Sequence, residues 1–133
     1  MMRNLMGLIL LLMLTLVGCG LETKTLPEFY EGDFGHVTKI AIVDGSTGYK
    51  KTITDHVVIN EFLAQIKEIK FIPQENQEAR SGWRYSINLF QDGKEPFQFT
   101  LTQVNDDYYY TEPDIHPIVD DFYKNLDVQE ENL

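Results

Sequence analysis

The strongest constraint on the fold is a regular alternation of apolar and polar residues between Trp83 and Thr102. Apolar side chains occupy alternate positions on both sides of Asp92-Gly93: Trp83, Tyr85, Ile87, Leu89, Phe97, Phe99 and Leu101. A period of two is that of a β-strand whose faces differ, and Asp-Gly favours a tight turn. The stretch therefore predicts a β-hairpin with one polar face and one apolar face, which other elements must cover.

The remaining segments supply further strands and two helices. β-branched residues predict a hairpin over residues 37–54. A polar loop is expected over 74–82, before the hairpin described above, and a short strand at 108–110 after that hairpin. Apolar residues at helical spacing predict a helix from about His56 to Lys70, capped by Asp55, and another over 115–126, capped by Asp114. The order ββαβββα predicts an α+β fold, with an antiparallel sheet of about five strands and both helices on one face.

The first 18 residues have the pattern of a signal peptide. Arg3 places a positive charge near the start, and residues 5–17 are almost entirely apolar. A helix of that length spans roughly 20 Å, short of the ~30 Å hydrocarbon core of a bilayer. The pattern therefore favours a cleaved leader over a permanent membrane-spanning helix.

The only cysteine of the chain, Cys19, directly follows this segment. The residues Leu16-Val17-Gly18-Cys19 resemble the lipobox of bacterial lipoproteins, and the rest of the chain is similar to small lipoproteins of unknown function. The resemblance implies that Cys19 receives a diacylglyceryl group, with palmitate as a typical acyl chain, and that cleavage follows Gly18. Two acyl chains give stable anchoring. The alternatives are an ordinary secretory leader and an uncleaved helix that happens to end in cysteine.

The chain is expected to consist of four parts. The signal peptide is residues 1–18, and residues 19–35 are expected to form a lipidated N-terminus and a flexible tether. Residues 36–127 hold every predicted strand and helix except the leader, so they should fold alone as a single α+β domain. Residues 128–133 are expected to be an acidic tail.

The charge balance limits the possible partners. The chain has 21 acidic residues against 11 Lys and Arg, a formal net charge of −10. An acidic surface repels phosphate backbones, so nucleic acid is excluded as a partner, and contact with the membrane is left to the lipid on Cys19. A single cysteine also rules out an intramolecular disulfide and a thiolate zinc site. We expect a monomer.

No familiar catalytic or cofactor-binding motif fits the sequence. Residues 45–52 have the residue types of a phosphate loop without its spacing, and the acidic stretch 106–114 lacks the ligand alternation of an EF-hand. The three histidines, His36, His56 and His116, lie too far apart to share a helix turn, and no serine stands in a nucleophile elbow. We therefore expect no metal, no cofactor and no enzymatic activity.

Two groups of residues remain as candidates for recognition. The first is the polar face of the predicted hairpin, with Arg84, Asn88, Gln98 and Thr100 as its contact residues. The second is a set of aromatic residues: Trp83, Tyr85, Phe97 and Phe99 on adjacent strands, and the run Tyr108–Tyr110. In that run at least one side chain should point away from the core, because neighbouring strand residues face opposite ways. The alternative roles are a solvated surface for the first group and core packing for the second.

These observations favour a membrane-anchored, extracytoplasmic binding or interaction module of unknown ligand, at the outer face of the cytoplasmic membrane of a Gram-positive cell. Another envelope protein is one candidate partner. The alternatives are a small envelope hydrolase and a passive accessory subunit of a membrane complex. A pocket of convergent ionisable groups would favour the enzyme, whereas exposed aromatic residues on an acidic surface would favour the binding module.

Overall fold

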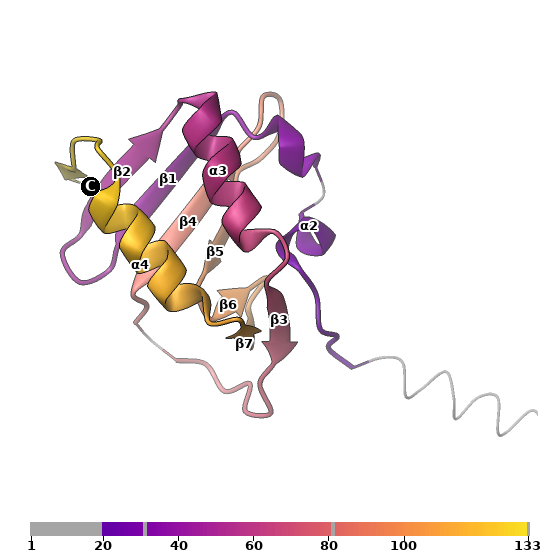
Figure 1. Ribbon diagram of the computed structural model, residues 1–133. Coiled ribbons are helices and arrows are strands. Elements are labelled where there is room, and N and C mark those ends of the chain that lie inside the picture. The colour runs from indigo at the N-terminus through magenta and orange to yellow at the C-terminus, as the bar shows by residue number, and fades with distance from the viewer. Residues whose placement is uncertain (1–19, 31, 81, 133) are drawn as a thin grey trace, which may run out of the picture.

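The computed structural model describes residues 20–30, 32–80 and 82–132. Within these residues the protein is an α+β fold with one antiparallel sheet of eight strands and three α-helices (Figure 1). The strands are β1 (Lys39–Asp44), β2 (Tyr49–Ile53), β3 (Lys70–Pro73), β4 (Tyr85–Phe90), β5 (Phe97–Thr100), β6 (Gln103–Val104), β7 (Asp107–Glu112) and β8 (Glu131–Asn132). The helices are α2 (Leu26–Phe29), α3 (His56–Ile66) and α4 (Ile115–Asn125), with a 3₁₀ turn, η1 (Phe34–His36). The predicted class is confirmed, but the predicted numbers of about five strands and two helices are too low.

The strand order across the sheet is β3-β7-β6-β5-β4-β1-β2-β8. Both predicted hairpins are present, since β1 pairs with β2 and β4 pairs with β5. The β4–β5 turn contains Gly93 at φ 75°, a left-handed conformation that glycine adopts without steric cost. The apolar residues of this hairpin are buried as predicted from Tyr85 to Leu89.

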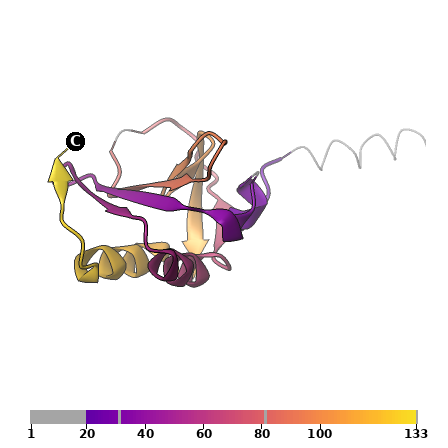
Figure 2. The ribbon, with the colours of Figure 1, turned by 90° about the horizontal axis from the view of Figure 1, so that it is seen from above.

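Two helices cover one face of the sheet, as predicted. Figure 2 shows α3 and α4 together on the same side. Both predicted caps are formed, because Asp55 accepts a hydrogen bond from the Val57 amide at 2.9 Å and Asp114 accepts one from the His116 amide at 3.0 Å. The helices bury their apolar faces against the central strands: Ile59, Phe62, Leu63 and Ile66 from α3, and Ile115, Val119 and Tyr123 from α4.

Helix α3 is shorter than predicted. It ends at Ile66 instead of about Lys70, and residues 70–73 form the edge strand β3, which pairs with β7. The apolar spacing continues through Ile69, which is buried, but Phe71 is buried from a strand. Helical spacing alone could not separate these two ways of burying side chains. Pro73 fits at the end of an edge strand, where a missing amide proton does little harm.

A short hairpin between β6 and β7 was also missed. Its turn consists of Asn105 and Asp106, both at positive φ (50° and 70°), which is the pattern of a type I′ turn. Asn and Asp tolerate this conformation better than other side-chain-bearing residues. The hairpin adds β6 and extends the predicted strand at 108–110 to Asp107–Glu112.

The predicted tether is largely part of the folded domain, which corrects the boundary at residue 36. Leu26 in α2 is fully buried, Tyr30 is 8% exposed, and both belong to the core. Lys24 and Phe71 exchange two backbone hydrogen bonds, at 3.0 and 2.7 Å. The predicted acidic tail differs as well, because β8 pairs with β2. A mixed sequence without periodicity gave no sign of either contact, since each depends on a distant partner.

The predicted signal peptide, the lipobox and Cys19 lie outside the described residues. Among the residues that the structure does describe, no helix has both the length and the apolar composition needed to cross a membrane.

Candidate functional site

Three of the four predicted contact residues share one face of the sheet. Asn88 on β4 lies opposite Gln98 on β5, and Thr100 lies opposite Ser86. The Gln98 amide donates a hydrogen bond to the Ser86 hydroxyl at 2.9 Å. Gln98 is exposed, whereas Ser86 is 2% exposed. The predicted polar face therefore exists on the side away from α3 and α4.

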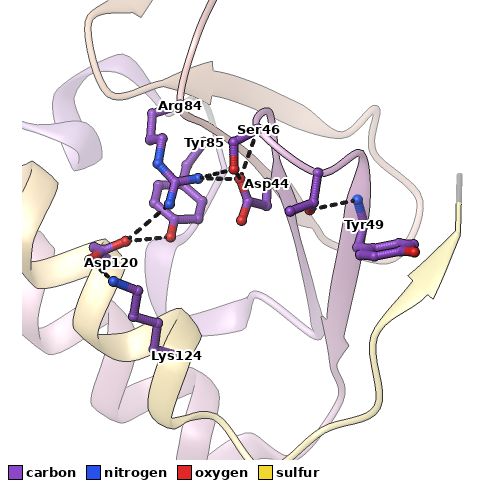
Figure 3. Close-up of polar contacts among 8 residues, drawn as sticks. Asp44, Ser46, Tyr49, Arg84, Tyr85, Asp120 and Lys124 are labelled. Carbon is purple, nitrogen blue, oxygen red and sulfur yellow. Dashed lines mark hydrogen bonds and ion pairs between the residues drawn. The ribbon is translucent and has the colours of Figure 1, made fainter.

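Arg84 is not part of that face. It precedes β4 and belongs to what we call the Arg84 cluster (Figure 3). The members of this cluster are Asp44, Ser46, Arg84, Tyr85, Asp120 and Lys124. The Arg84 guanidinium pairs with Asp44, donates to the Ser46 hydroxyl at 3.0 Å and lies 3.5 Å from a carboxylate oxygen of Asp120 on α4. It also lies 4.5 Å from the centre of the Tyr85 ring.

Asp120 is the point where α4 joins the Arg84 cluster. Its carboxylate accepts a hydrogen bond from the Tyr85 hydroxyl at 2.6 Å and pairs with Lys124 at 2.8 Å. The contact with Lys124, followed by the bond from Tyr85, lowers the pKa of Asp120 below its usual 3.8. Burial, followed by the bond to Asp120, raises the pKa of Tyr85. The two cations, Arg84 and Lys124, are thus balanced by the carboxylates of Asp44 and Asp120. The cluster joins α4 to the sheet, and its charged groups are paired with one another.

A cleft of about 400 Å³ lies beside this cluster, at the start of α4. We call it the aromatic cleft. Its lining residues come from four segments: the β3–β4 connection, the β5–β6 connection, β7 and the start of α4. They include Trp83, Arg84, Thr102, Tyr110, Asp114 and His116.

The aromatic residues of the cleft are unusually exposed. Trp83 is 44% exposed and Tyr110 is 50% exposed. The prediction that one tyrosine of the run would point outward is confirmed, since Tyr108 and Tyr109 are only 7% and 3% exposed. The prediction that Trp83 belongs to the buried face of the hairpin is wrong, because β4 begins only at Tyr85. The alternation of apolar and polar residues begins at Trp83, two residues before the first residue of β4.

Trp83 is held against the β1–β2 turn. A methyl group added at Gly45 would lie 2.1 Å from the Trp83 carbonyl oxygen and 2.8 Å from its ring. Only a glycine fits there, because both distances are far below van der Waals contact. The glycine therefore allows the backbone and ring of Trp83 to approach the turn.

The β3–β4 connection is held to β7 by tyrosine and glutamine side chains. Gln77 both donates to the Tyr108 carbonyl at 2.9 Å and accepts from the Tyr108 amide at 2.8 Å. The Tyr108 hydroxyl accepts from the Arg80 amide at 2.9 Å, and Gln74 donates to the Tyr109 carbonyl at 2.9 Å. These bonds join side chains to backbone groups and hold the connection, with Gln74 of the cleft wall, against β7.

The polar groups of the cleft are mixed in sign. Arg84 contributes a cation and Asp114 a carboxylate, of which one oxygen is engaged by the His116 amide. Among the described residues, neither the Thr102 hydroxyl nor the His116 imidazole takes part in a hydrogen bond. Within the same part of the chain, no group of three His, Cys, Asp or Glu residues could hold a metal ion.

A larger groove of about 600 Å³ runs between α3 and α4. Apolar side chains line it together with the carboxylates of Glu61, Asp121 and Asp127. The groove has none of the exposed aromatic residues that distinguish the aromatic cleft. Phe122, its only aromatic side chain, stacks on Phe62 with ring centres 4.4 Å apart. We therefore attribute the groove to helix packing and place the candidate site at the cleft.

Of the cleft residues, the sequence pointed to Arg84 and Tyr110, and to Trp83 only as an aromatic residue expected to pack in the core. It gave no sign of His116. No known protein family, no curated protein and no solved structure matches this chain.

Proposed function

We propose that this protein is a lipid-anchored, extracytoplasmic binding module that holds its ligand in the aromatic cleft. The observation that carries the proposal is the convergence of two exposed aromatic side chains, Trp83 and Tyr110, from separate parts of the chain on one cleft. Exposed aromatic residues are costly to leave in water and are typical of contact surfaces. The polar face around Gln98 is a second, solvated surface in this proposal.

Binding is favoured over hydrolysis by the way the ionisable groups are used. Arg84 is neutralised by Asp44 and Asp120, and Asp114 caps α4. A hydrolase needs a nucleophile or a general acid and base poised around one point. The charged groups of the cleft instead serve to hold its walls.

The anchor is tested by substitution of Cys19. Cys19→Ser should abolish incorporation of labelled fatty acid and release the protein from the membrane fraction, because the lipid has no other site in the proposal. Unchanged labelling of the variant would contradict lipidation at this residue.

The cleft is tested by capture of envelope material. Full-length protein, extracted from membranes and immobilised, is exposed to separated wall polysaccharide, lipid and protein fractions of the source cell. Wild-type protein should retain one fraction, and Trp83→Ala and Tyr110→Ala should lose it. Substitutions at exposed positions change the free energy of unfolding by only about 0.5 kcal/mol. Chemical unfolding of each variant checks that it remains as stable as the wild type.

Tyr49→Ala is the matched control. Tyr49 is 41% exposed on β2 and does not line the cleft. Equal retention by wild type and both cleft variants, or equal loss in the Tyr49 variant, would overturn the proposed site. Turnover of a retained component would favour the hydrolase instead.

A further inference from the structure

We propose that the aromatic cleft binds a neutral glycan segment. This inference rests on the proposed function, because it names the ligand class of the same site.

The charges of the cleft disfavour an anionic ligand. Such a ligand would meet the Asp114 carboxylate in a protein whose net charge is −10, and Arg84 is already paired with two carboxylates. The cleft is not built for a cation either, because Asp114 is the only carboxylate among its described lining residues and uses one oxygen to cap α4. An uncharged ligand needs no such partner, so the aromatic surfaces and hydrogen-bonding groups determine what binds.

The aromatic side chains match the apolar faces of sugar rings. Each pyranose ring presents C–H groups on its faces, and these carry a partial positive charge because oxygen atoms are attached to the same carbons. The faces of Trp and Tyr rings carry the negative part of an aromatic quadrupole. Trp83 and Tyr110 each keep about half of their surface open for such contacts, at 44% and 50% exposure.

The polar groups match hydroxyls. The Thr102 hydroxyl and the His116 imidazole can each donate and accept hydrogen bonds, and the second oxygen of Asp114 can accept one. Sugar hydroxyls need partners of both kinds, since each hydroxyl donates one bond and accepts others. A purely aliphatic ligand would leave these groups desolvated and unpaired, at a cost of about 1–3 kcal/mol for each buried group.

Trp83 allows the inference to be tested directly, because it is the only tryptophan of the chain. Full-length protein, extracted in a detergent without sugar head groups, is titrated with chitotetraose, cellotetraose and maltotetraose while tryptophan emission is recorded. At least one oligosaccharide should give a saturable change. Tyr110→Ala should weaken that binding by about tenfold, whereas Tyr49→Ala should leave it unchanged.

Choline and inorganic phosphate serve as charged probes. A saturable change with either of them, lost in Tyr110→Ala, or no change with any oligosaccharide, overturns the glycan assignment. The proposed function survives either result if capture of envelope material still depends on Trp83 and Tyr110. It fails together with the glycan assignment if neither experiment depends on them.

Discussion

At the scale of single residues, Arg84 and Asp120 determine how the cleft meets α4. Arg84 is bound on one side by Asp44 from β1 and on the other by Asp120 from α4. Tyr85 connects the same two elements through its hydroxyl. Charge-assisted hydrogen bonds of this kind are stronger than neutral ones, and several sharing one carboxylate fix its position. The first turn of α4, which lines the cleft, is therefore held by contacts made one turn further along the helix.

Asp120→Asn should make the folding of the protein less sensitive to acid. The folded-state pKa of Asp120 lies below its unfolded value of 3.8, chiefly because of Lys124 and the Tyr85 hydroxyl. Its stabilising contribution is therefore present above pH 3.8 and is lost as the pH falls through the folded-state pKa. In urea unfolding, the variant should be less stable at pH 7 and lose less stability between about pH 4 and pH 2 than the wild type.

Asp121→Asn provides the control on the same helix, since Asp121 is exposed and lies outside the Arg84 cluster. It should retain the wild-type acid response. Parallel loss of stability in Asp120→Asn and wild type over this pH range would show that the cluster contributes no pH-dependent stability.

At the scale of elements, the C-terminal end of α4 depends on a lysine from the sheet. Lys51 on β2 is 7% exposed, and its ammonium donates to the carbonyls of Tyr123 and Leu126 at 2.7 and 2.9 Å. It also lies 4.7 Å from the centre of the Tyr123 ring. A cation at this end of a helix satisfies carbonyls without helical partners and opposes the helix dipole.

Lys51→Met should therefore lower the free energy of unfolding by about 1–3 kcal/mol, because two carbonyls lose a charged donor. Lys50→Met is its matched control, since Lys50 faces the other way and pairs with Glu131 only at 3.9 Å. An exposed pair of this kind contributes about 0–1 kcal/mol. Chemical unfolding of both variants measures the difference, and equal losses would rule out a special role for Lys51.

The elements that sequence patterns predicted are those whose signals are local. Asp55 and Asp114 mark the N-termini of the two long helices, and alternation of apolar and polar residues predicts the β4–β5 hairpin. Three of the missed elements, β3, β8 and α2, are short and are defined by partners far away in the chain. Lys24 lies 47 residues before its partner Phe71, so no window of sequence contains both. The turn at Asn105-Asp106 is the exception, because its residue types did signal a hairpin.

At the scale of the whole molecule, the cleft exists only where four segments meet. Tyr110 could be predicted from alternation within a strand, and Arg84 was selected, although for the wrong surface. Trp83 was one of the aromatic candidates, but its exposure could not be predicted, because that depends on where β4 begins and on the approach to Gly45. His116 was only one of three widely separated histidines in the sequence, and the fold brings it to Trp83 and Tyr110. Site residues drawn from separate elements carry no common sequence spacing.

The limits of the folded unit give a final prediction, which revises the expectation that residues 36–127 fold independently. Residues 20–132 alone should unfold cooperatively, and residues 36–127 should be less stable by at least about 2–5 kcal/mol, the usual cost of removing a buried leucine. The reason is that the shorter chain lacks Leu26, which is fully buried, and Tyr30, which is 8% exposed. It also lacks the bonds from Lys24 to the edge strand β3.

Residues 20–127 separate the two ends of the chain. This form lacks only β8, whose residues are exposed and pair with β2 over two positions, so it should remain close in stability to residues 20–132. Urea unfolding followed by circular dichroism measures all three forms, and tryptophan emission reports whether the environment of Trp83 is retained. If residues 36–127 unfold at the same urea concentration as residues 20–132, α2 is an attached segment and not a part of the core, and the original boundary at residue 36 is restored.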